Sequence, residues 1–428
     1  TSSPVGSRPD SASAAAGAGD AQVVVNLAKD TAMESMDPIN AEDGFSMELI
    51  GAMMSGLYTL DGEDNLVQDL ATACTISEDN LTYTFALRED AKWSNGEPVT
   101  ANDFVFAWRR LADPAVAGAY AWMLDEVAGV KNAAAVETGE MDVTELGVSA
   151  PDDYTFVVEL SRPVPFFEKL MVFTPFFPLN EKFVTEQGEN FALTADNLLY
   201  SGPYVMTEWD VGGTRIVLEK NPNYYDTGSI KTNVINYQII ADTQQAVMSY
   251  ENGDIDFVKL TGDLVNQYRG NEGFSTQAGG YIWNLMPNCE NKYFSNLNFR
   301  LAVSSSIDRD TIVNFILNDG SVVAHGYILE DFAKGPDGKF FRETATSYNF
   351  TDKDKAVEYW EAAKKELGID GAKFTLLYED SESASNVAAF IQSEIESTLE
   401  GVTVEMQSVP KKVRIENMQA GDFDIALH

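Results

Sequence analysis

The chain has 428 residues, of which 44% are hydrophobic and 22% charged, a composition typical of a soluble globular protein with a large core. This length exceeds what one core normally supports, so we expect two or three domains. The 67 acidic against 29 basic residues give a formal net charge of -38. That charge argues against binding nucleic acid and against unaided binding to anionic lipid, because both need positive charge. No stretch approaches the roughly 18 apolar residues of a membrane span.

The cysteines and histidines give little support for a metal or cofactor site. Cys74 and Cys289 are far apart; they could form a disulfide, but we favour two free, buried thiols. Neither His325 nor His428 stands at ligand spacing to a cysteine or to the other histidine, so we expect no zinc site and no cofactor. We interpret His325 as a loop or packing residue rather than a catalyst.

The N-terminal part of the chain predicts a tether, a strand and a helix. Residues 1–20 are mostly Ser, Ala, Gly and Pro, so we expect a disordered leader. It has no cationic and apolar signal-peptide regions, which indicates that any signal peptide has been removed. Vector-derived residues would explain part of this stretch equally well. Residues 23–27 predict a short buried strand, and residues 45–58 predict an amphipathic helix that begins near Asp43.

Residues 81–110 predict a strand, a tight turn and a helix. The run TYTFAL alternates apolar and polar residues, which is typical of a half-buried strand. Asn95 and Gly96 supply the positive backbone angles of a tight turn. Thr100 followed three residues later by Asp103 forms a near-capping box that starts a helix. Nothing in this pattern is catalytic.

Further along, strands and helices alternate. Residues 201–226 predict two strands that form a hairpin around Gly212 and Gly213. Beyond them, a strand, a helix ending at Gly253 and a second strand (residues 234–240, 242–250 and 255–258) indicate a β-α-β unit with a parallel sheet. Residues 281–286 predict an apolar strand. Between residues 356 and 427, helix and strand alternate three times, which indicates a doubly wound lobe whose ligands bind at the carboxyl ends of its strands.

Several of these stretches carry a family resemblance. The run LREDAKWSNGEPVTANDFVFAW resembles the signature segment of the extracytoplasmic solute-binding proteins of peptide-type ABC importers, peptide-type solute-binding family 5. A Gly-Pro-Tyr, hairpin, Asn-Pro-Asn-Tyr block over residues 202–224 is similar to the same family. The resemblance extends over nearly everything from residue 23 onward and is closest to the oligopeptide binders. Without it, the signature run would be a solvated hairpin on any α/β protein.

The resemblance implies an α/β, two-lobed fold like the periplasmic binding proteins, of type II and of the large peptide-binding cluster. It implies a lobe I from residues 21–60 plus 190–278, an inserted subdomain from 61–189, and a lobe II from 279–428, after the leader 1–20. In oligopeptide binders the next segment resembles Gly-Trp-x-Ala-Asp-Tyr, whose acidic residue pairs with the peptide's α-ammonium. The chain ends before such a segment, so we expect the C-terminal part of lobe II to be missing.

The resemblance also implies ligand-binding residues. In oligopeptide binders the loop before the first helix lines the ligand cleft, which here would be Asp43, Gly44 and Phe45; an ordinary strand-to-helix connection with Asp43 near the N-cap explains them as well. Tyr120 and Trp122 lie near the position of an aromatic residue over the cleft, although both could equally belong to the core.

The crossing strand of such proteins also places aromatic side chains toward the cleft. By the same resemblance, we expect Tyr281 and Trp283 to be in contact with the ligand.

The function that the resemblance implies is the substrate-binding component of an ABC importer. Such a protein captures oligopeptides between two hinged lobes, by main-chain hydrogen bonds, and delivers them to the permease and ATPase subunits. We expect a non-enzymatic monomer outside the cytoplasm, either periplasmic or a surface lipoprotein. The same fold could instead bind nickel, haem or an oligosaccharide, or act as a peptide sensor. A hydrolase would need a nucleophile-base or acid-base pair, which we do not recognise in the sequence.

Overall fold

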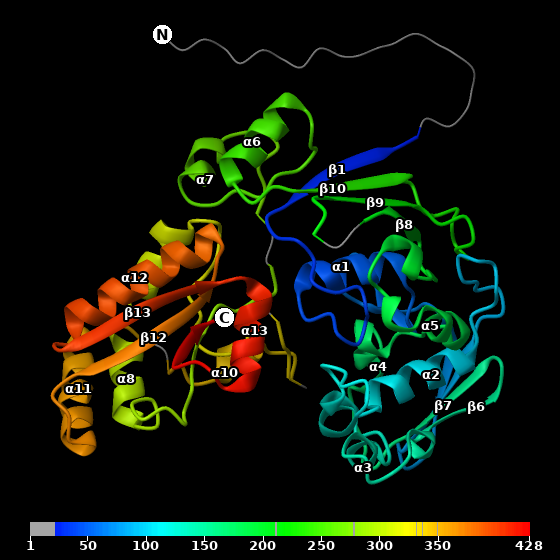
Figure 1. Cartoon of the computed structure of the whole chain (residues 1–428), viewed down its shortest axis with the longest axis horizontal. Coiled ribbons are helices and arrows are strands. Elements are labelled where there is room, and N and C mark those ends of the chain that lie inside the picture. Colours follow the sequence, from blue (N-terminus) through cyan, green and yellow to red (C-terminus); the bar gives the residue numbers. More distant parts are fainter. Residues whose placement is uncertain (1–21, 210–211, 277–278, 331, 336, 349) are drawn as a thin grey trace. The chain divides into compact units, whose positions relative to one another are not determined.

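The computed structural model describes residues 22–209, 212–276, 279–330, 332–335, 337–348 and 350–428 (Figure 1). The predicted leader, residues 1–20, lies outside the described residues. The chain divides into two compact units: unit 1 from residues up to Asn26 and Ser35–Gln238, and unit 2 from Leu27–Glu34 and Ile239–His428. The finer division into two lobes and an inserted subdomain stays a prediction.

The first sheet is built from segments far apart in the sequence. Its strand order is β1-β10-β9-β8, with β9 antiparallel to both β8 and β10. The predicted hairpin is confirmed, because β8 and β9 are neighbours and Gly212 takes a φ of 78° in their connection. The strands are β1 (Val24–Lys29), β8 (Tyr204–Glu208), β9 (Arg215–Lys220) and β10 (Val234–Ile239).

Helix α1 (Gly44–Met53) is shorter than the predicted helix over residues 45–58. It ends where the backbone of Gly202, from the Gly-Pro-Tyr block, donates a hydrogen bond to the carbonyl of Met53 at 2.8 Å. The approach is close, because a Cβ on Gly202 would lie 2.7 Å from the Met53 backbone. Tyr58 instead opens strand β2 (Tyr58–Leu60), which pairs with β3 (Leu66–Gln68). The predicted C-terminal turn of the helix is therefore wrong.

A second sheet of unit 1 holds the stretch that the sequence predicted as strand, turn and helix. Its order is β4-β5-β7-β6, all antiparallel, and its central strand β5 buries alternate residues as predicted. Helix α2 (Ala101–Ala112) begins with the predicted capping box, in which Thr100 N–H donates to the Asp103 carboxylate at 2.7 Å. The strands are β4 (Ala71–Ile76), β5 (Thr82–Leu87), β6 (Val148–Asp152) and β7 (Thr155–Glu159).

The turn before α2 differs in one detail from the prediction. Only Gly96 takes a positive φ, of 89°, while Asn95 stays in the ordinary range. The Asn95 side chain instead accepts a hydrogen bond from Glu97 N–H at 3.0 Å, and Gly96 N–H donates to the Trp93 carbonyl at 2.8 Å. A three-residue loop that ends in a left-handed glycine needs only one residue with positive φ. The positive angle predicted for Asn95 is therefore wrong.

Short helices complete unit 1 between these sheets and their loops. They are π-helix η1 (Met123–Val127), α3 (Ala133–Glu137), 3-10 helix η2 (Val143–Glu145), α4 (Phe167–Leu170), 3-10 helix η3 (Thr174–Phe176), α5 (Glu181–Gln187), 3-10 helix η4 (Gly188–Asn190) and 3-10 helix η5 (Ala195–Asn197).

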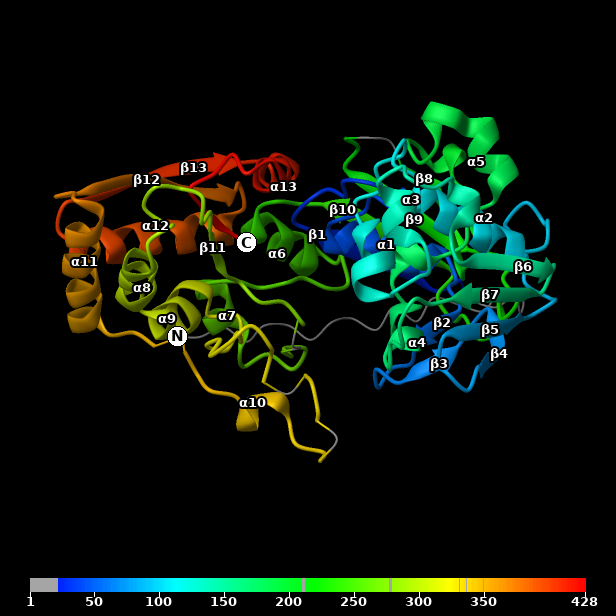
Figure 2. The ribbon, with the colours of Figure 1, turned by 90° about the horizontal axis from the view of Figure 1, so that it is seen from below.

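Unit 2 contains the predicted doubly wound arrangement. Its sheet has the order β11-β14-β12-β13, with β12 parallel to β13 and β14, and β11 antiparallel to β14. Helix α12 lies along β12 and β13 (Figure 2). These elements are β11 (Leu285–Pro287), α11 (Lys353–Leu367), β12 (Ala372–Glu379), α12 (Glu382–Thr398), β13 (Val402–Val409), α13 (Lys411–Ala420) and β14 (Ile425–Leu427). The three predicted helix-strand alternations are confirmed.

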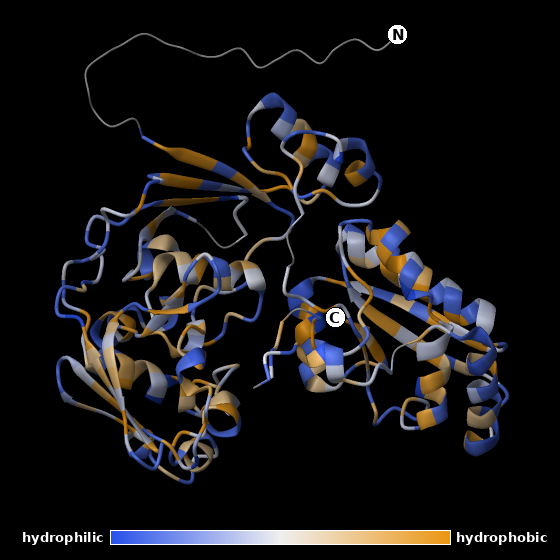
Figure 3. Ribbon diagram, turned by 180° about the vertical axis from the view of Figure 1, so that it is seen from behind, coloured by the Kyte–Doolittle hydropathy of each residue, from blue (hydrophilic) through white to orange (hydrophobic). Residues whose placement is uncertain are grey.

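The core of unit 2 lies between this sheet and its helices. Helix α11 buries Ala356, Trp360 and Ala363, at helical spacing, and packs against α8 (Leu297–Ser306). The colouring of Figure 3 changes between orange and blue along α11 and α12, as expected for helices with one buried face. Further helices of the unit are α6 (Thr243–Asn252), α7 (Asp263–Tyr268), α9 (Arg309–Thr311), π-helix η6 (Ile312–Leu317) and α10 (Phe341–Thr344).

Two predicted strands of unit 2 are shorter in the structure. Residues 255–258 form a single parallel bridge, between Phe257 and Leu27, instead of a strand. The strand predicted over 281–286 is observed as β11 from Leu285 onward, and Asn284 continues its pairing through two backbone hydrogen bonds with His428. Gly253 ends α6 with a φ of 80°, as predicted.

Cys74 and Cys289 are both free, as we favoured, but they are not buried: Cys74 is half-buried and Cys289 is exposed. Cys289 lies just after β11, in a turn before α8, where no core covers it. In the described ranges, no helix combines the length and the apolar character that crossing a bilayer requires.

Candidate functional site

The loop before α1 places the first group of predicted ligand-binding residues. Asp43 is buried and accepts a hydrogen bond from Ser46 N–H at 2.8 Å, so it is the N-cap of the helix. Gly44 is partly exposed. Phe45 is buried, and its ring centroid lies 5.3 Å from that of Tyr237. The N-cap interpretation of Asp43 is thus confirmed, whereas contact of this loop with a ligand stays a prediction.

Tyr120 lies next to this loop, although 75 positions separate it from Phe45 in the sequence. Burial, together with the negative charges of Glu42 and Asp43, raises the pKa of Tyr120 to about 12. The preceding residue, Ala119, donates its N–H to the carbonyl of Ile39 at 3.1 Å, which ties the two segments together. The Tyr120 side chain therefore stays protonated at neutral pH, as a neutral hydrogen-bonding group beside two carboxylates.

Tyr120 and Trp122 differ in their surroundings. The ring of Tyr120 packs edge-on against Phe173, with centroids 5.0 Å apart, and is half-buried. Trp122 is 47% exposed, so it does not belong to the core. The core alternative is therefore wrong for Trp122, while Tyr120 is partly packed and partly accessible. Sequence reasoning missed Tyr237 and Phe173 as the aromatic neighbours of Phe45 and Tyr120, because they come from other elements. The strand predicted over residues 234–240 did not show what Tyr237 contacts.

The second group of predicted residues belongs to unit 2. Tyr281 is 74% exposed and Trp283 42% exposed. Both precede β11, so they lie on irregular chain rather than on the predicted strand. The next residue, Asn284, exchanges two backbone hydrogen bonds with His428, at 2.8 and 2.9 Å, which fixes the base of this segment. The structure thus brings together Asp43, Phe45 and Tyr120 in one unit and places Tyr281 and Trp283 in the other.

A polar cluster that the sequence analysis missed lies at the carboxyl ends of β12 and β14. Arg414, in the first turns of α13, is 4% exposed. Its Nη1 contacts Nδ1 of His428 at 2.5 Å, and its Nη2 lies 3.5 Å from Oε2 of Glu379. Partial burial of the imidazole, together with the Arg414 charge, lowers the pKa of His428, so that its ring is neutral at neutral pH.

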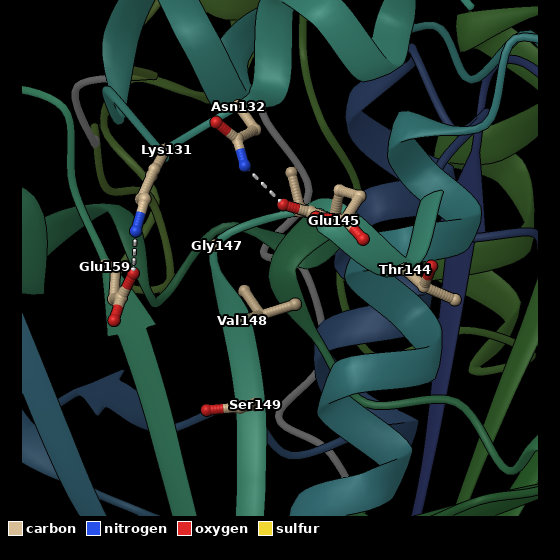
Figure 4. Close-up of a pocket in the computed structure, with 9 residues that line it drawn as sticks. Lys131, Asn132, Thr144, Glu145, Gly147, Val148, Ser149 and Glu159 are labelled. Atoms are coloured by element: carbon tan, nitrogen blue, oxygen red, sulfur yellow. Dashed lines mark hydrogen bonds and ion pairs between the residues drawn. The ribbon is translucent and has the colours of Figure 1, made fainter. Parts of the chain in front are cut away.

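A surface pocket of about 230 Å³ lies elsewhere in unit 1 (Figure 4). Lys131 Nζ and Glu159 Oε2 form an ion pair there at 2.6 Å, and Asn132 Nδ2 donates to the carbonyl of Glu145 at 2.7 Å. These polar groups satisfy one another, and none of the predicted ligand-binding residues lines the pocket. Across the described residues there is no group of three or more His, Cys, Asp or Glu side chains that could hold a metal ion.

Residues 65–428 match the model of the bacterial extracellular solute-binding proteins, family 5 Middle, and the chain belongs to this family. The family consists of solute-binding proteins that act outside the cytoplasm. The predicted family and the predicted two-lobed α/β fold are therefore confirmed.

Individual relatives extend over most of the chain. A dipeptide-binding protein of Lactococcus lactis is 31% identical over 413 residues, 93% of this chain and 74% of the relative. The periplasmic oligopeptide-binding protein OppA of Salmonella typhimurium is 32% identical over 406 residues, 92% of this chain and 72% of the relative. The solved structure of Listeria monocytogenes OppA bound to peptide superposes with a TM-score of 0.90, at 33% identity, and covers 95% of this chain and 81% of that one.

Proposed function

We propose that the protein captures oligopeptides outside the cytoplasm and delivers them to the permease and ATPase subunits of an ABC importer. The observation that carries this proposal is the likeness to Listeria monocytogenes OppA bound to peptide, which extends over 95% of the chain at a TM-score of 0.90. Relatives that are named as dipeptide- and oligopeptide-binding proteins support the same class of ligand.

The proposed mode of recognition uses the peptide's main chain. An extended peptide offers N–H and carbonyl groups at regular spacing whatever its side chains are, so main-chain hydrogen bonds give affinity that tolerates sequence. Wet side-chain pockets then accept different residues, because water can bridge what the protein does not contact directly. Such a binder needs no catalytic pair.

The proposed ligand contacts come from both units. In unit 1 they are Asp43, Gly44, Phe45, Tyr120 and Trp122, and in unit 2 they are Tyr281 and Trp283. Exposure of Trp122, Tyr281 and Trp283 supports this assignment, because accessible aromatic side chains are available for a ligand. Ligand would favour a closed arrangement of the lobes only to the extent that it binds that arrangement more tightly than the open one.

The oligomeric state and the attachment to the membrane belong to the same proposal. We propose that the protein acts as a monomer, either free in the periplasm or held at the membrane by a lipid anchor ahead of residue 22. The net charge of -38 supports a lipid anchor over direct adhesion to anionic lipid, because the protein surface would be repelled by such a membrane.

Mass spectrometry of the cargo that co-purifies with the protein tests the proposed class of ligand. The proposal expects a mixture of short peptides of varied sequence, released on denaturation. A single defined non-peptide species, such as a metal complex, haem or an oligosaccharide, would overturn it. Cleavage of added peptides during incubation would instead support a hydrolase.

Tryptophan fluorescence tests the proposed contact at Trp283. Peptide binding should shift the emission of the wild-type protein, and Trp283→Phe should lose part of that shift, because Trp122 is the other tryptophan among the proposed contacts and keeps its own share. Trp209→Phe is the matched control, because Trp209 is buried and lies outside the proposed contacts. Equal shifts in Trp283→Phe and in the wild type would remove Trp283 from the site without affecting the proposed class of ligand.

A further inference from the structure

A turn in unit 1 carries a short motif that the proposed contacts with a peptide leave unused. Residues 80–82 read Asn-Leu-Thr, which matches the acceptor motif Asn-x-Ser/Thr for N-linked glycans. Because the motif is short, its surroundings in the structure decide whether it can be used. It serves as an acceptor on the surface of proteins that leave the cytoplasm, and the family of this chain consists of extracellular solute-binding proteins.

The motif lies at the tip of a hairpin. Strands β4 and β5 are antiparallel neighbours, and the last pair in their register is Ile76 with Tyr83. Asn80 N–H donates to the Ser77 carbonyl at 2.9 Å within the turn that follows. Asn80 is exposed and takes a φ of 58°, a left-handed conformation that asparagine tolerates better than most residues. Enzymes reach a folded chain most easily at exposed tips of this kind.

The hydrogen bonds of the turn leave the acceptor groups free. Ser77 Oγ accepts hydrogen bonds from the N–H groups of Leu81 and Thr82, at 3.3 and 2.9 Å. Asp79 Oδ1 accepts another from Leu81 N–H, at 3.1 Å. In the part of the chain that the structure describes, neither the Asn80 carboxamide nor the Thr82 hydroxyl has a hydrogen-bond partner. Both groups that define the motif are therefore available to an enzyme.

A second motif of the same kind, residues 349–351, has different surroundings. Its asparagine lies outside the described residues, and the hydroxyl of its Thr351 already donates a hydrogen bond to the Ile307 carbonyl at 2.7 Å. Two positions before its asparagine stands the uncharged Ser347. By contrast, the exposed Glu78 precedes Asn80 by two positions and gives an enzyme a charged group to recognise. These differences favour the motif at residues 80–82.

We propose that Asn80 is a site of N-linked glycosylation, with an oligosaccharide on a lipid pyrophosphate as the donor. Nδ2 of Asn80 forms a bond to the anomeric carbon of the first sugar. The bond from that carbon to the pyrophosphate oxygen breaks, and the lipid pyrophosphate leaves with the electron pair. Nδ2 gives up one proton to a base of the transferring enzyme, so the reaction needs neither an oxidant nor a reductant. This site goes beyond the proposed function and does not depend on which ligand the protein binds.

A glycan at Asn80 lies beside an open edge of the second sheet. Strand β4 stands at one end of the order β4-β5-β7-β6, so one of its sides has no neighbouring strand among the described residues. Its last residue, Ile76, is 40% exposed. An exposed strand edge can pair with the edge of another chain. A bulky hydrophilic group next to this edge hinders such pairing.

Peptide mapping by mass spectrometry tests the site, on protein purified from the cells that natively produce it. We expect the peptide that contains Asn80 to carry the mass of an oligosaccharide. Asn80→Gln should lose the whole increment. Thr82→Val keeps the carboxamide and removes the hydroxyl, so it should lose the increment as well, whereas Thr82→Ser keeps the hydroxyl and should retain it.

Asn349→Gln is the matched control and should leave the modification of Asn80 unchanged. An unmodified Asn80 in the native protein would overturn the proposal, as would a glycan that persists in Thr82→Val or one that occupies Asn349 alone. Should Asn80→Gln fail to fold, because a φ of 58° suits glutamine less well, the Thr82→Val and Thr82→Ser pair still decides the question. Each of these outcomes leaves the proposed peptide binding as it stands, since co-purified cargo is measured separately.

Discussion

Two arginine sites, one in each unit, differ in how completely the guanidinium is paired. In unit 1, Nη1 and Nη2 of Arg110 bond separate oxygens of Asp37, at 2.9 and 2.6 Å. In unit 2, Arg414 is more buried, but its Nη2 lies 3.5 Å from Oε2 of Glu379. The first arrangement is closed and joins α2 to the segment before α1. The second leaves Nε of Arg414 without a hydrogen-bond partner.

Breaking the closed pair should give the largest loss of stability. Asp37→Asn would leave the Arg110 guanidinium, whose side chain is only 15% exposed, without a compensating charge. Removing one partner of a buried pair costs about 3 to 5 kcal/mol, and we expect the lower end of this range because the pair is only partly buried. Urea unfolding of the unliganded protein measures this loss.

The double variant Asp37→Asn with Arg110→Met is the control for the closed pair. It removes both charges, so it should recover part of the lost free energy of unfolding. A loss below about 1 kcal/mol in Asp37→Asn alone would show that the pair is solvated and would weaken the contrast with Arg414.

Asp103 extends the comparison to a buried carboxylate that has only neutral partners. Burial raises the pKa of Asp103 to about 6, against the opposing hydrogen bonds from Thr100 and the Trp93 indole. The folded state therefore binds more protons than the unfolded state between pH 4 and pH 6, and this contribution to stability falls as the pH rises through that window. Asp103→Asn should flatten the pH dependence of the unfolding free energy there. An unchanged slope would contradict the raised pKa.

Asp103→Ala is the matched variant for the hydrogen bonds rather than the charge. It removes the acceptor for Thr100 N–H, at 2.7 Å, and for Trp93 Nε1, at 3.3 Å. Loss of a helix cap of this kind costs about 1 to 2 kcal/mol. Asp103→Asn keeps an acceptor oxygen and should lose less, as thermal unfolding at neutral pH would show.

Replacing Arg414 should lower the free energy of unfolding less than any of these changes does. In Arg414→Met, the carboxylate left behind is Glu379, which is 26% exposed and can be hydrated. We therefore expect the unliganded variant to unfold within about 1 kcal/mol of the wild type, because an incompletely paired buried charge stabilises little. A loss of unfolding free energy as large as that in Asp37→Asn would mean that Arg414 also stabilises the fold.

The sequence predicted local structure well, but it did not predict the cluster of Arg414, Glu379 and His428. The capping box of Thr100 and Asp103, the hairpin around Gly212 and the three helix-strand alternations depend on neighbours within a few residues, so their patterns are visible in one sequence. The end of α1 was mispredicted because the closely packed Gly202, about 150 positions away, determines it.

The site residues, too, were predictable only where local patterns sufficed. Contacts such as that of Tyr120 with the loop before α1 were expected only through a family resemblance, because no local pattern relates two distant segments. Arg414, Glu379 and His428 come together because β14 lies beside β12 in the sheet. Strand order is a property of the whole fold, so periodicity within each element could not reveal this cluster.

The smallest effect is expected at the exposed pair of Lys131 and Glu159. Its distance of 2.6 Å is as short as the closed pair of unit 1, but the two side chains are 53% and 49% exposed. Water screens such charges, so Lys131→Ala should change the unfolding free energy by less than about 0.5 kcal/mol. High salt should leave the difference between this variant and the wild type nearly unchanged. A larger loss would mean that distance, rather than burial, governs the contribution of a charged pair in this protein, and the contrast between Arg110 and Arg414 would then need a different physical basis.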